Sequence, residues 1–230
     1  MRPFDVSAVL DAVTEVYPPA DVLLAAARTG DRDVRYAISR LWLSEGIPFA
    51  FRSRPSIYEA LRIWLARSLD VQAKEITIVG SARQGFSLSP DKNVGRAFGP
   101  QSDLDMTVIS LILLQRLSDA FWRWDQDYTQ MVVHPRHDHE KVLWDENRHN
   151  CPIALKHGFI DPHKIPTWAR YPEAKAVMDA LWRIHEKLKV TPQAPNVRKV
   201  SLRVYRDWDS FVRQMAINLE AVGRIAKPVS

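Results

Sequence analysis

Two aspartates and a Gly-Ser pair are the residues of this chain whose types and spacing could carry out chemistry. An apolar, β-branched run over residues 76–79 stops at Gly80 and Ser81, and after a polar loop Asp103 and Asp105 lead into a second apolar run. Side chains two residues apart on a strand point to the same face, so the two carboxylates converge and repel unless a cation lies between them. A Gly-Ser turn can bring backbone N–H groups close to a phosphate. The pattern therefore predicts a site for a divalent metal ion and a nucleoside triphosphate.

This constellation resembles the DNA polymerase β-like nucleotidyltransferase superfamily. The hallmark of that superfamily is a Gly-Ser turn with a further glycine, followed by a strand that carries an Asp-x-Asp pair. The matching residues here are Gly80, Ser81, Gly85, Asp103 and Asp105. The resemblance implies that the two aspartates are catalytic and ligate Mg²⁺ or Mn²⁺, and that the Gly-Ser turn holds the triphosphate of an NTP.

The resemblance is specific over roughly residues 58–110 of the chain. Looser similarity extends to the minimal nucleotidyltransferases of toxin–antitoxin systems and to the cyclic-oligonucleotide synthases of bacterial antiphage defence. By this analogy we expect a metal-dependent nucleotidyltransferase that transfers a nucleotidyl group from an NTP to RNA, to a protein hydroxyl or to a second nucleotide. The motif does not choose among these acceptors, and a role in defence follows from the analogy alone.

Nucleotidyl transfer attacks the α-phosphorus of the NTP and expels pyrophosphate, so the protein must supply positioning and charge neutralisation. Mg²⁺ keeps several waters and needs only one or two carboxylates besides phosphate oxygens. A pair of metal ions would activate the attacking hydroxyl and stabilise the leaving oxygen. We expect Ser81 to hydrogen-bond the β- or γ-phosphate and Gly85 to permit close packing of the next loop. Two further candidates for nucleotide binding are Arg83 and Lys92.

The sequence departs from the pattern of the superfamily in its third carboxylate, which is not found at the expected place. Active members usually carry one on a neighbouring strand, but the candidate strand at residues 197–205 has Ser201 and Arg203 where an acidic residue is expected. The remaining acidic candidates are Asp161, Asp207 and Asp209. The last two are equally explained as residues at the start of a helix. The alternative function is therefore a catalytically degenerate nucleotidyltransferase fold that binds nucleotide, or an antitoxin-like partner that uses its N-terminal helices as an interface.

Three other features of the sequence contain residues that could carry out chemistry. The loop at residues 86–101 looks like an insertion, either a lid or recognition loop or a simple surface excursion. The histidine-rich segment at residues 134–140 is interpreted as a solvated polar loop, with a substrate-facing basic loop as the alternative, because no pair of histidines has a recognised zinc spacing. Nothing marks Cys151, the single cysteine, as a nucleophile.

Composition narrows the class of protein. The chain has 230 residues, 46% of them hydrophobic, with eight tryptophans, which is typical of a globular core. The net charge of +5 suits a phosphate-rich ligand such as an NTP or RNA, although it also fits an ordinary surface. A lone cysteine favours a reducing compartment, and we recognise neither a signal peptide nor an apolar run long enough to cross a membrane. We therefore expect a cytoplasmic protein that makes no contact with a membrane.

The periodicity predicts an α+β fold, with a small mixed sheet flanked by helices and preceded by a helical extension at residues 1–55. The nucleotidyltransferase-like domain would then span residues 56–230. Strands are expected at residues 75–79, 104–109 and 197–205, with a short candidate at 131–133. Helices are expected at residues 5–28 (broken at two prolines), 31–45, 57–69 with Ser56 as N-cap, 111–128, 172–189 and 210–224.

Overall fold

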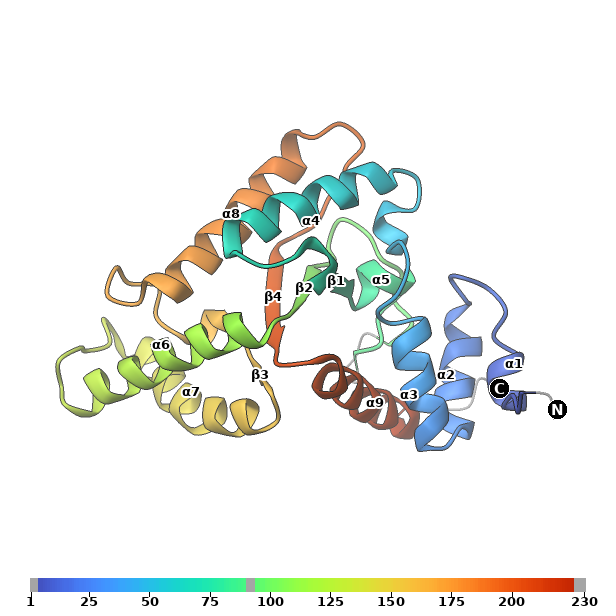
Figure 1. The fold of residues 1–230 in the computed structure, drawn as a ribbon, viewed down its shortest axis with the longest axis horizontal. Coiled ribbons are helices and arrows are strands. Elements are labelled where there is room, and N and C mark those ends of the chain that lie inside the picture. The colour runs from blue at the N-terminus through green and yellow to red at the C-terminus, as the bar shows by residue number, and fades with distance from the viewer. Residues whose placement is uncertain (1–3, 90–93, 226–230) are drawn as a thin grey trace.

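A four-stranded mixed sheet lies at the centre of the molecule and is flanked by helices (Figure 1). The computed structural model describes residues 4–89 and 94–225. The strands are β1 (Ile76–Val79), β2 (Leu104–Ile109), β3 (Phe159–Ile160) and β4 (Val200–Tyr205), and their order in the sheet is β1-β2-β4-β3. Strand β2 pairs antiparallel with β1 and parallel with β4, whereas β3 pairs antiparallel with β4. The predicted α+β class is confirmed at this level.

The helices come from all parts of the chain. The α-helices are α1 (Ala8–Asp11), α2 (Ala20–Thr29), α3 (Arg32–Leu41), α4 (Pro55–Leu69), α5 (Ser81–Gln84), α6 (Leu111–Thr129), α7 (Asp138–Lys156), α8 (Pro172–Val190) and α9 (Trp208–Ile225). Short 3₁₀ turns are η1 (Phe49–Phe51), η2 (Ala73–Glu75) and η3 (Pro162–Lys164).

Apolar and polar side chains alternate along β2, so the two faces of the sheet differ in character. Leu104, Met106 and Val108 are buried in the main core, so Asp105 and Thr107 between them point to the opposite face. The register sets Ser201 of β4 beside Asp105. The polar side chains of neighbouring strands therefore gather on one face, and the apolar ones gather on the other.

The apolar face is covered by α4, α6 and α8. Their buried side chains join those of β1, β2 and β4 in one cluster that includes Leu65, Leu117, Phe121 and Leu181. The helix α6 begins where Ser110 accepts a hydrogen bond from the backbone N–H of Leu113. Burying each large apolar side chain contributes about 1.5–3 kcal/mol. This layer is therefore the main source of stability, and it holds β2 in place.

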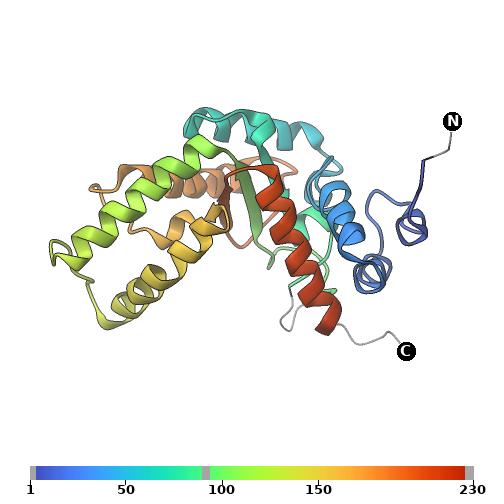
Figure 2. The ribbon, with the colours of Figure 1, turned by 60° about the horizontal axis from the view of Figure 1, so that its bottom comes forward.

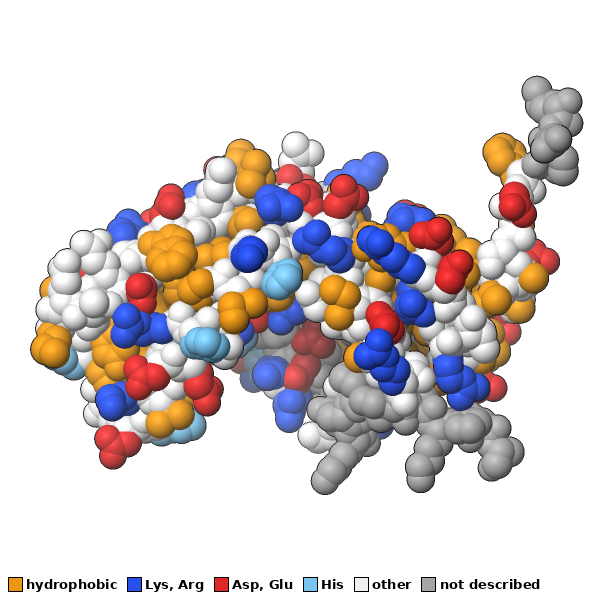
Figure 3. Space-filling model, turned by 90° about the horizontal axis from the view of Figure 1, so that it is seen from below, with side chains coloured by type: hydrophobic (Ala, Val, Ile, Leu, Met, Phe, Trp, Pro, Cys, Tyr) orange, Lys and Arg blue, Asp and Glu red, His pale blue; other side chains and the backbone are white. Residues whose placement is uncertain are grey.

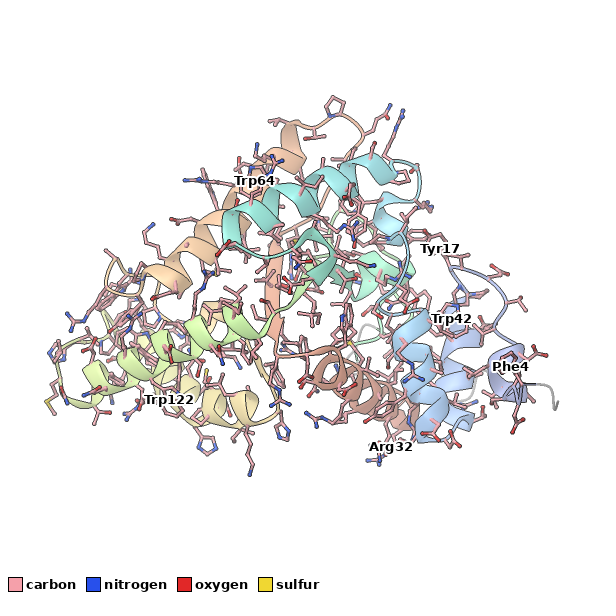
Figure 4. All side chains as sticks on the ribbon, viewed as in Figure 1. Phe4, Tyr17, Arg32, Trp42, Trp64 and Trp122 are labelled. Atoms are coloured by element: carbon pink, nitrogen blue, oxygen red, sulfur yellow. The ribbon has the colours of Figure 1, made fainter. Side chains whose placement is uncertain are left out.

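The polar face is partly closed by α9 and the N-terminal helices. The helices α2 and α3 pack on α9 (Figures 1 and 2), and Leu23, Ile38 and Leu219 share a second buried cluster. The apolar stripes of these N-terminal helices are thus buried within the chain itself. Two polar contacts fix this layer: the Trp42 indole, seen in Figure 4, donates to the Glu15 carbonyl, and the Thr77 hydroxyl donates to the Ser44 carbonyl.

Several local predictions were wrong. Residues 131–133 form a turn rather than a strand. The segment at residues 134–140 leads into α7, where His137 is the N-cap and accepts from the Glu140 N–H. Helix α4 starts at Pro55 with Arg54 as N-cap, so Ser56 lies in the first turn instead of capping it. Proline fits there because its fixed φ suits the first helical position and its missing N–H would be unpaired anyway.

Candidate functional site

A cavity of about 640 Å³ opens on the polar face of the sheet. It is bounded by β2 and β4, by the Gly-Ser turn and α5, and by the inner side of α9, and both predicted aspartates line it. Figure 3 shows the molecule from below, where one face is hollowed near its middle and acidic and basic side chains lie close together. The volume lies within the range of small-molecule binding sites.

Gly80 lets the turn approach the carboxylates. Its φ of +67° and ψ of −154° belong to a region that essentially only glycine occupies. A Cβ at this position would lie 3.0 Å from Oδ2 of Asp105. Ser81, the next residue, begins α5 and lines the cavity. The sequence-predicted turn is therefore in direct contact with the sequence-predicted carboxylate.

Gly85 ends the short helix α5. Its φ of +96° is left-handed, and a Cβ there would lie 2.9 Å from Cδ2 of the Phe49 ring. The glycine thus lets the chain leave α5 against that ring, so its effect is on packing. It does not line the cavity.

Asp105 is held in an environment that disfavours its charge. Burial, and next the negative charge of Asp103, raise the pKa of the Asp105 carboxyl above its ordinary value. The Ser201 hydroxyl donates to Oδ1 of Asp105 at 2.6 Å and opposes this rise. A cation beside Asp105 would stabilise its ionised form.

The pKa of the Asp103 carboxyl is shifted in the opposite direction, below its ordinary value. Arg198 donates to both of its carboxylate oxygens, at 2.9 and 3.0 Å, and Lys199 lies 3.5 Å from Oδ2. Burial acts to raise the pKa of Asp103, but the hydrogen bonds and charges of these two residues outweigh it and lower the pKa. Arg198 and Lys199 come just before β4, and the sequence analysis did not single them out.

The register offers no acidic side chain at the third-carboxylate position. Ser201 is the residue of β4 paired with Asp105. Asp161 also lines the cavity, but Arg203 donates to both of its oxygens, at 2.7 and 3.0 Å, and Lys164 lies 3.5 Å away. In the parts of the chain that the structure describes, no three acidic, histidine or cysteine side chains are grouped to hold a metal ion.

The other two acidic candidates, Asp207 and Asp209, do not line the cavity. Asp207 accepts a hydrogen bond from the Ser210 N–H at 2.7 Å in the first turn of α9. Burial would raise the pKa of Asp207, but the hydrogen bonds from Arg206 and Ser210 dominate and lower it to about 2. Asp209 is exposed on α9 and does not line the cavity.

Arg83, the first of the two basic candidates, does not line the cavity. Arg83 is 2% exposed, and its guanidinium donates to the carbonyls of Trp42, at 2.9 Å, and Ile47, at 2.7 Å. It ties the N-terminal helices to α5. Lys92 lies outside the described residues. The basic side chains that do line the cavity include Arg96, Arg198 and Lys199.

Cys151 is fully buried. Burial raises the pKa of its thiol to about 11, so the side chain is a neutral member of the core.

The donor set at Asp103 and Asp105 fits a magnesium ion. Both side chains line the cavity at the start of β2, and Mg²⁺ is commonly held by one or two carboxylates plus phosphate oxygens and water. Coordination through Asp103 requires that Arg198 release at least one of its oxygens. The site therefore fits a metal ion that binds together with a phosphate group, because the phosphate gives Arg198 another partner.

No family model, no curated protein and no solved structure matches this chain. Among the helices of the described residues, none combines the length and apolarity that crossing a membrane requires.

Proposed function

We propose that this chain is a metal-dependent nucleotidyltransferase whose substrate is an NTP. The observation that carries the proposal is the approach of the Gly80 turn to Asp105, beside Asp103, in one cavity on the sheet. A glycine-dependent turn in contact with paired carboxylates would bring phosphate and metal ligands to the same point. The resemblance in motif and the small mixed sheet support the same assignment.

Five residues of the cavity have a role under this proposal. Asp103 and Asp105 would hold the metal ion, which supplies charge neutralisation at the reacting phosphate. Ser81 and the backbone of its turn would contact the β- or γ-phosphate. Arg198 and Lys199 would exchange their partner, Asp103, for phosphate oxygens, with Arg198 forming the bidentate contacts that a guanidinium favours. The acceptor that attacks the α-phosphorus would be RNA, a protein hydroxyl or a nucleotide.

A second candidate function is binding of an NTP without transfer. Two observations favour it: Ser201 occupies the register position beside Asp105, and Arg198 holds both oxygens of Asp103. Such a protein would use the same cavity and the same Gly-Ser turn. The two functions differ in whether the α-phosphorus is attacked.

The experiment is a transfer assay with NTPs labelled at the α-phosphate, in the presence of Mg²⁺. The acceptors offered are total RNA, the protein itself with a cell extract, and unlabelled nucleotides. We expect a labelled product with wild-type protein, loss of it in the double variant D103N/D105N, and retention of it in D119N, which changes an exposed aspartate of α6. NTP binding without any product supports the second function, and equal activity in the double variant refutes the site.

A further inference from the structure

His163 brings a titratable ring into the cavity on the side away from the Gly-Ser turn. It lies in η3, two residues after Asp161, and its side chain lines the cavity. Among the described residues, its ring has neither a hydrogen-bond partner nor an ion-pair partner, because the oxygens of Asp161 are taken by Arg203 and Lys164. The ring is therefore available to a ligand.

The register of the sheet shows where His163 lies relative to β4. Strands β3 and β4 run antiparallel, and their last pair joins Ile160 to Val204. One residue beyond the end of β3, the same register pairs Asp161 with Arg203, and the side chains of this pair are indeed in contact. Two residues further on, the register brings His163 to the residue of β4 that lies two positions before Arg203.

That residue of β4 is Ser201, which pairs with Asp105 of β2 on its other side. Neighbouring strands lie about 4.8 Å apart, so two strand spacings separate the backbones of His163 and Asp105 by about 10 Å. Lys199 and Arg203, which lie two residues to either side of Ser201, both act electrostatically on the His163 ring, in agreement with this placement. Because the Ser201 side chain is short, it leaves room above it for a ligand atom between the ring and the carboxylate.

The surroundings of His163 favour its neutral ring. The side chain keeps access to solvent, but the walls of the cavity desolvate it, and this burial is the main cause that lowers the pKa of its imidazole below the ordinary value. An imidazole with a lowered pKa is neutral at physiological pH and can accept a proton.

The charges around the ring act in both directions. Those that face it come from its own turn, from the region of β4 and, farther off, from the start of β2: Asp161, Lys164, Lys199, Arg203, Asp103 and Asp105. The three cations lower the pKa of the ring further, whereas the charge of Asp161 opposes them and would stabilise an imidazolium once it forms. Helix α7, which also packs on η3, contributes the neutral thiol of Cys151.

We propose that His163 is the base that accepts the proton of the attacking hydroxyl. The hydroxyl oxygen of the acceptor forms a bond to the α-phosphorus of the NTP, and the bond from that phosphorus to the oxygen of the departing pyrophosphate breaks. The hydroxyl proton passes to a ring nitrogen of His163, which later releases it to water. This inference rests on the proposed nucleotidyl transfer, and it gives His163 the part for which the register offers no third carboxylate.

The test compares His163→Gln and His163→Ala with wild-type protein in the transfer assay, with labelled NTPs, Mg²⁺ and the same three kinds of acceptor. Both variants should lower kcat about a hundredfold, which lies within the usual contribution of a general base, and should leave NTP affinity and the Mg²⁺ dependence of the rate unchanged. Added imidazole should restore activity to His163→Ala. The matched control His134→Gln, exposed and outside the cavity lining, should keep full activity.

The pH profile distinguishes a proton acceptor from a residue with a structural role. Proton NMR of the whole chain without ligand gives the pKa of His163, whose ring signal is the one missing from His163→Gln. The kcat/KM of wild type should rise with pH through this same value, because that ratio reports the ionisation of the free enzyme. The rise should be absent from His163→Gln.

If His163→Gln keeps the wild-type rate and pH profile, His163 is not the base, and the proposed transfer reaction stands. The same conclusion follows if His163→Ala stays inactive when imidazole is added. If wild-type protein forms no labelled product with any of the acceptors, the proposed transfer reaction fails together with this inference.

Discussion

The two faces of the central sheet are built from alternate residues of the same strands, yet they differ in almost every physical respect. Leu104 and Met106 of β2 pack against α4, α6 and α8, whereas Asp105 of the same strand and Asp103 just before it line an open cavity. The first face gains stability from apolar burial. The second contains a carboxylate whose pKa is raised by burial and by its neighbour, and it contains Gln84, whose buried side-chain oxygen has no hydrogen-bond partner.

This difference shows how the fold separates stability from chemistry within one strand. Packing on the apolar face fixes the position of β2 and hence of the carboxylates. The polar face can then hold groups that destabilise the empty protein, because a ligand would supply their missing partners. Substitutions on the polar face should therefore weaken binding with little loss of stability. Substitutions on the apolar face should lower stability with little effect on binding.

The largest effect is expected for the carboxylates. Asp105→Asn should weaken Mg²⁺-dependent NTP binding about a thousandfold, equivalent to about 4 kcal/mol, because it removes a ligand charge from the proposed metal site. The free energy of unfolding without ligand should stay equal or increase, since the variant relieves the repulsion between Asp103 and Asp105. Titration calorimetry and urea denaturation measure the two quantities. A variant that binds normally would show that the polar face is not a metal site.

The opposite result, a loss of stability with unchanged NTP binding, is expected for the adjacent residue, Leu104. Leu104→Ala should lower the free energy of unfolding by about 3 kcal/mol, because Leu104 is fully buried and the truncation leaves a cavity. NTP affinity, measured well below the Tm of the variant, should stay within about twofold of wild type, since the change acts on the other face. A large loss of affinity with intact folding would contradict the separation of the two faces.

The ion pair of Asp161 and Arg203 should give a smaller, pH-dependent effect on stability. Burial alone would raise the pKa of Asp161, but Arg203 and Lys164 lower it below its ordinary value. The ionised form therefore stabilises the fold above the ordinary pKa, and this contribution is lost as the pH falls through the lowered pKa. Asp161→Asn should cost about 2 kcal/mol at neutral pH, a value reduced because Arg203 is partly exposed.

The measurement for this pair is urea denaturation of both proteins from neutral to acidic pH. The difference in unfolding free energy between wild type and Asp161→Asn should shrink as the solution becomes more acidic. The pKa of His163 is lowered mainly by burial, and the Asp161 charge opposes this shift, so the loss of that charge also changes the titration of His163 and forms part of the measured difference. A difference that does not depend on pH would show that the Asp161 charge is not what stabilises the fold.

The smallest effect on stability is expected for a substitution of Gly80, in the turn between β1 and α5. Gly80→Ala should cost about 1–2 kcal/mol, because alanine is strained at this φ and ψ and its Cβ would press on Asp105. The control Gly99→Ala has open space around its Cβ and should be close to neutral. Both values come from denaturation, and NTP titration should show weaker binding only for Gly80→Ala. Equal stability of the two variants would refute the role given to Gly80.

The local parts of the site were predictable from sequence, and the non-local parts were not. Alternation placed a strand at residues 104–109, and β2 is Leu104–Ile109. The partner of Asp103 could not be read locally, because Arg198 reaches it only through the parallel pairing of β2 with β4. The basic pair just before β4 was the available signal, since the starts of parallel strands meet at one edge.

Two features of the structure could not be read from charge and composition alone. Arg83 is a cation in a phosphate-binding motif, but its guanidinium is buried against backbone carbonyls of the 42–47 segment, a tertiary contact that no local pattern reveals. The polar segment before α7 resembled a loop because its histidines and its single proline masked a helix start, where His137 acts as the N-cap. Whether Lys92 contacts nucleotide stays a prediction.

The most direct test of the central claim is a crystal structure with Mn²⁺ and an NTP analogue that cannot be cleaved at the α-phosphate, with anomalous data to locate the metal. We expect an anomalous peak about 2.1 Å from oxygens of both Asp103 and Asp105, the distance typical of Mg²⁺-like coordination. Arg198 should have released Asp103 and should contact phosphate. A bound nucleotide elsewhere, or a peak absent from this cavity with the Arg198–Asp103 pair intact, would contradict the account.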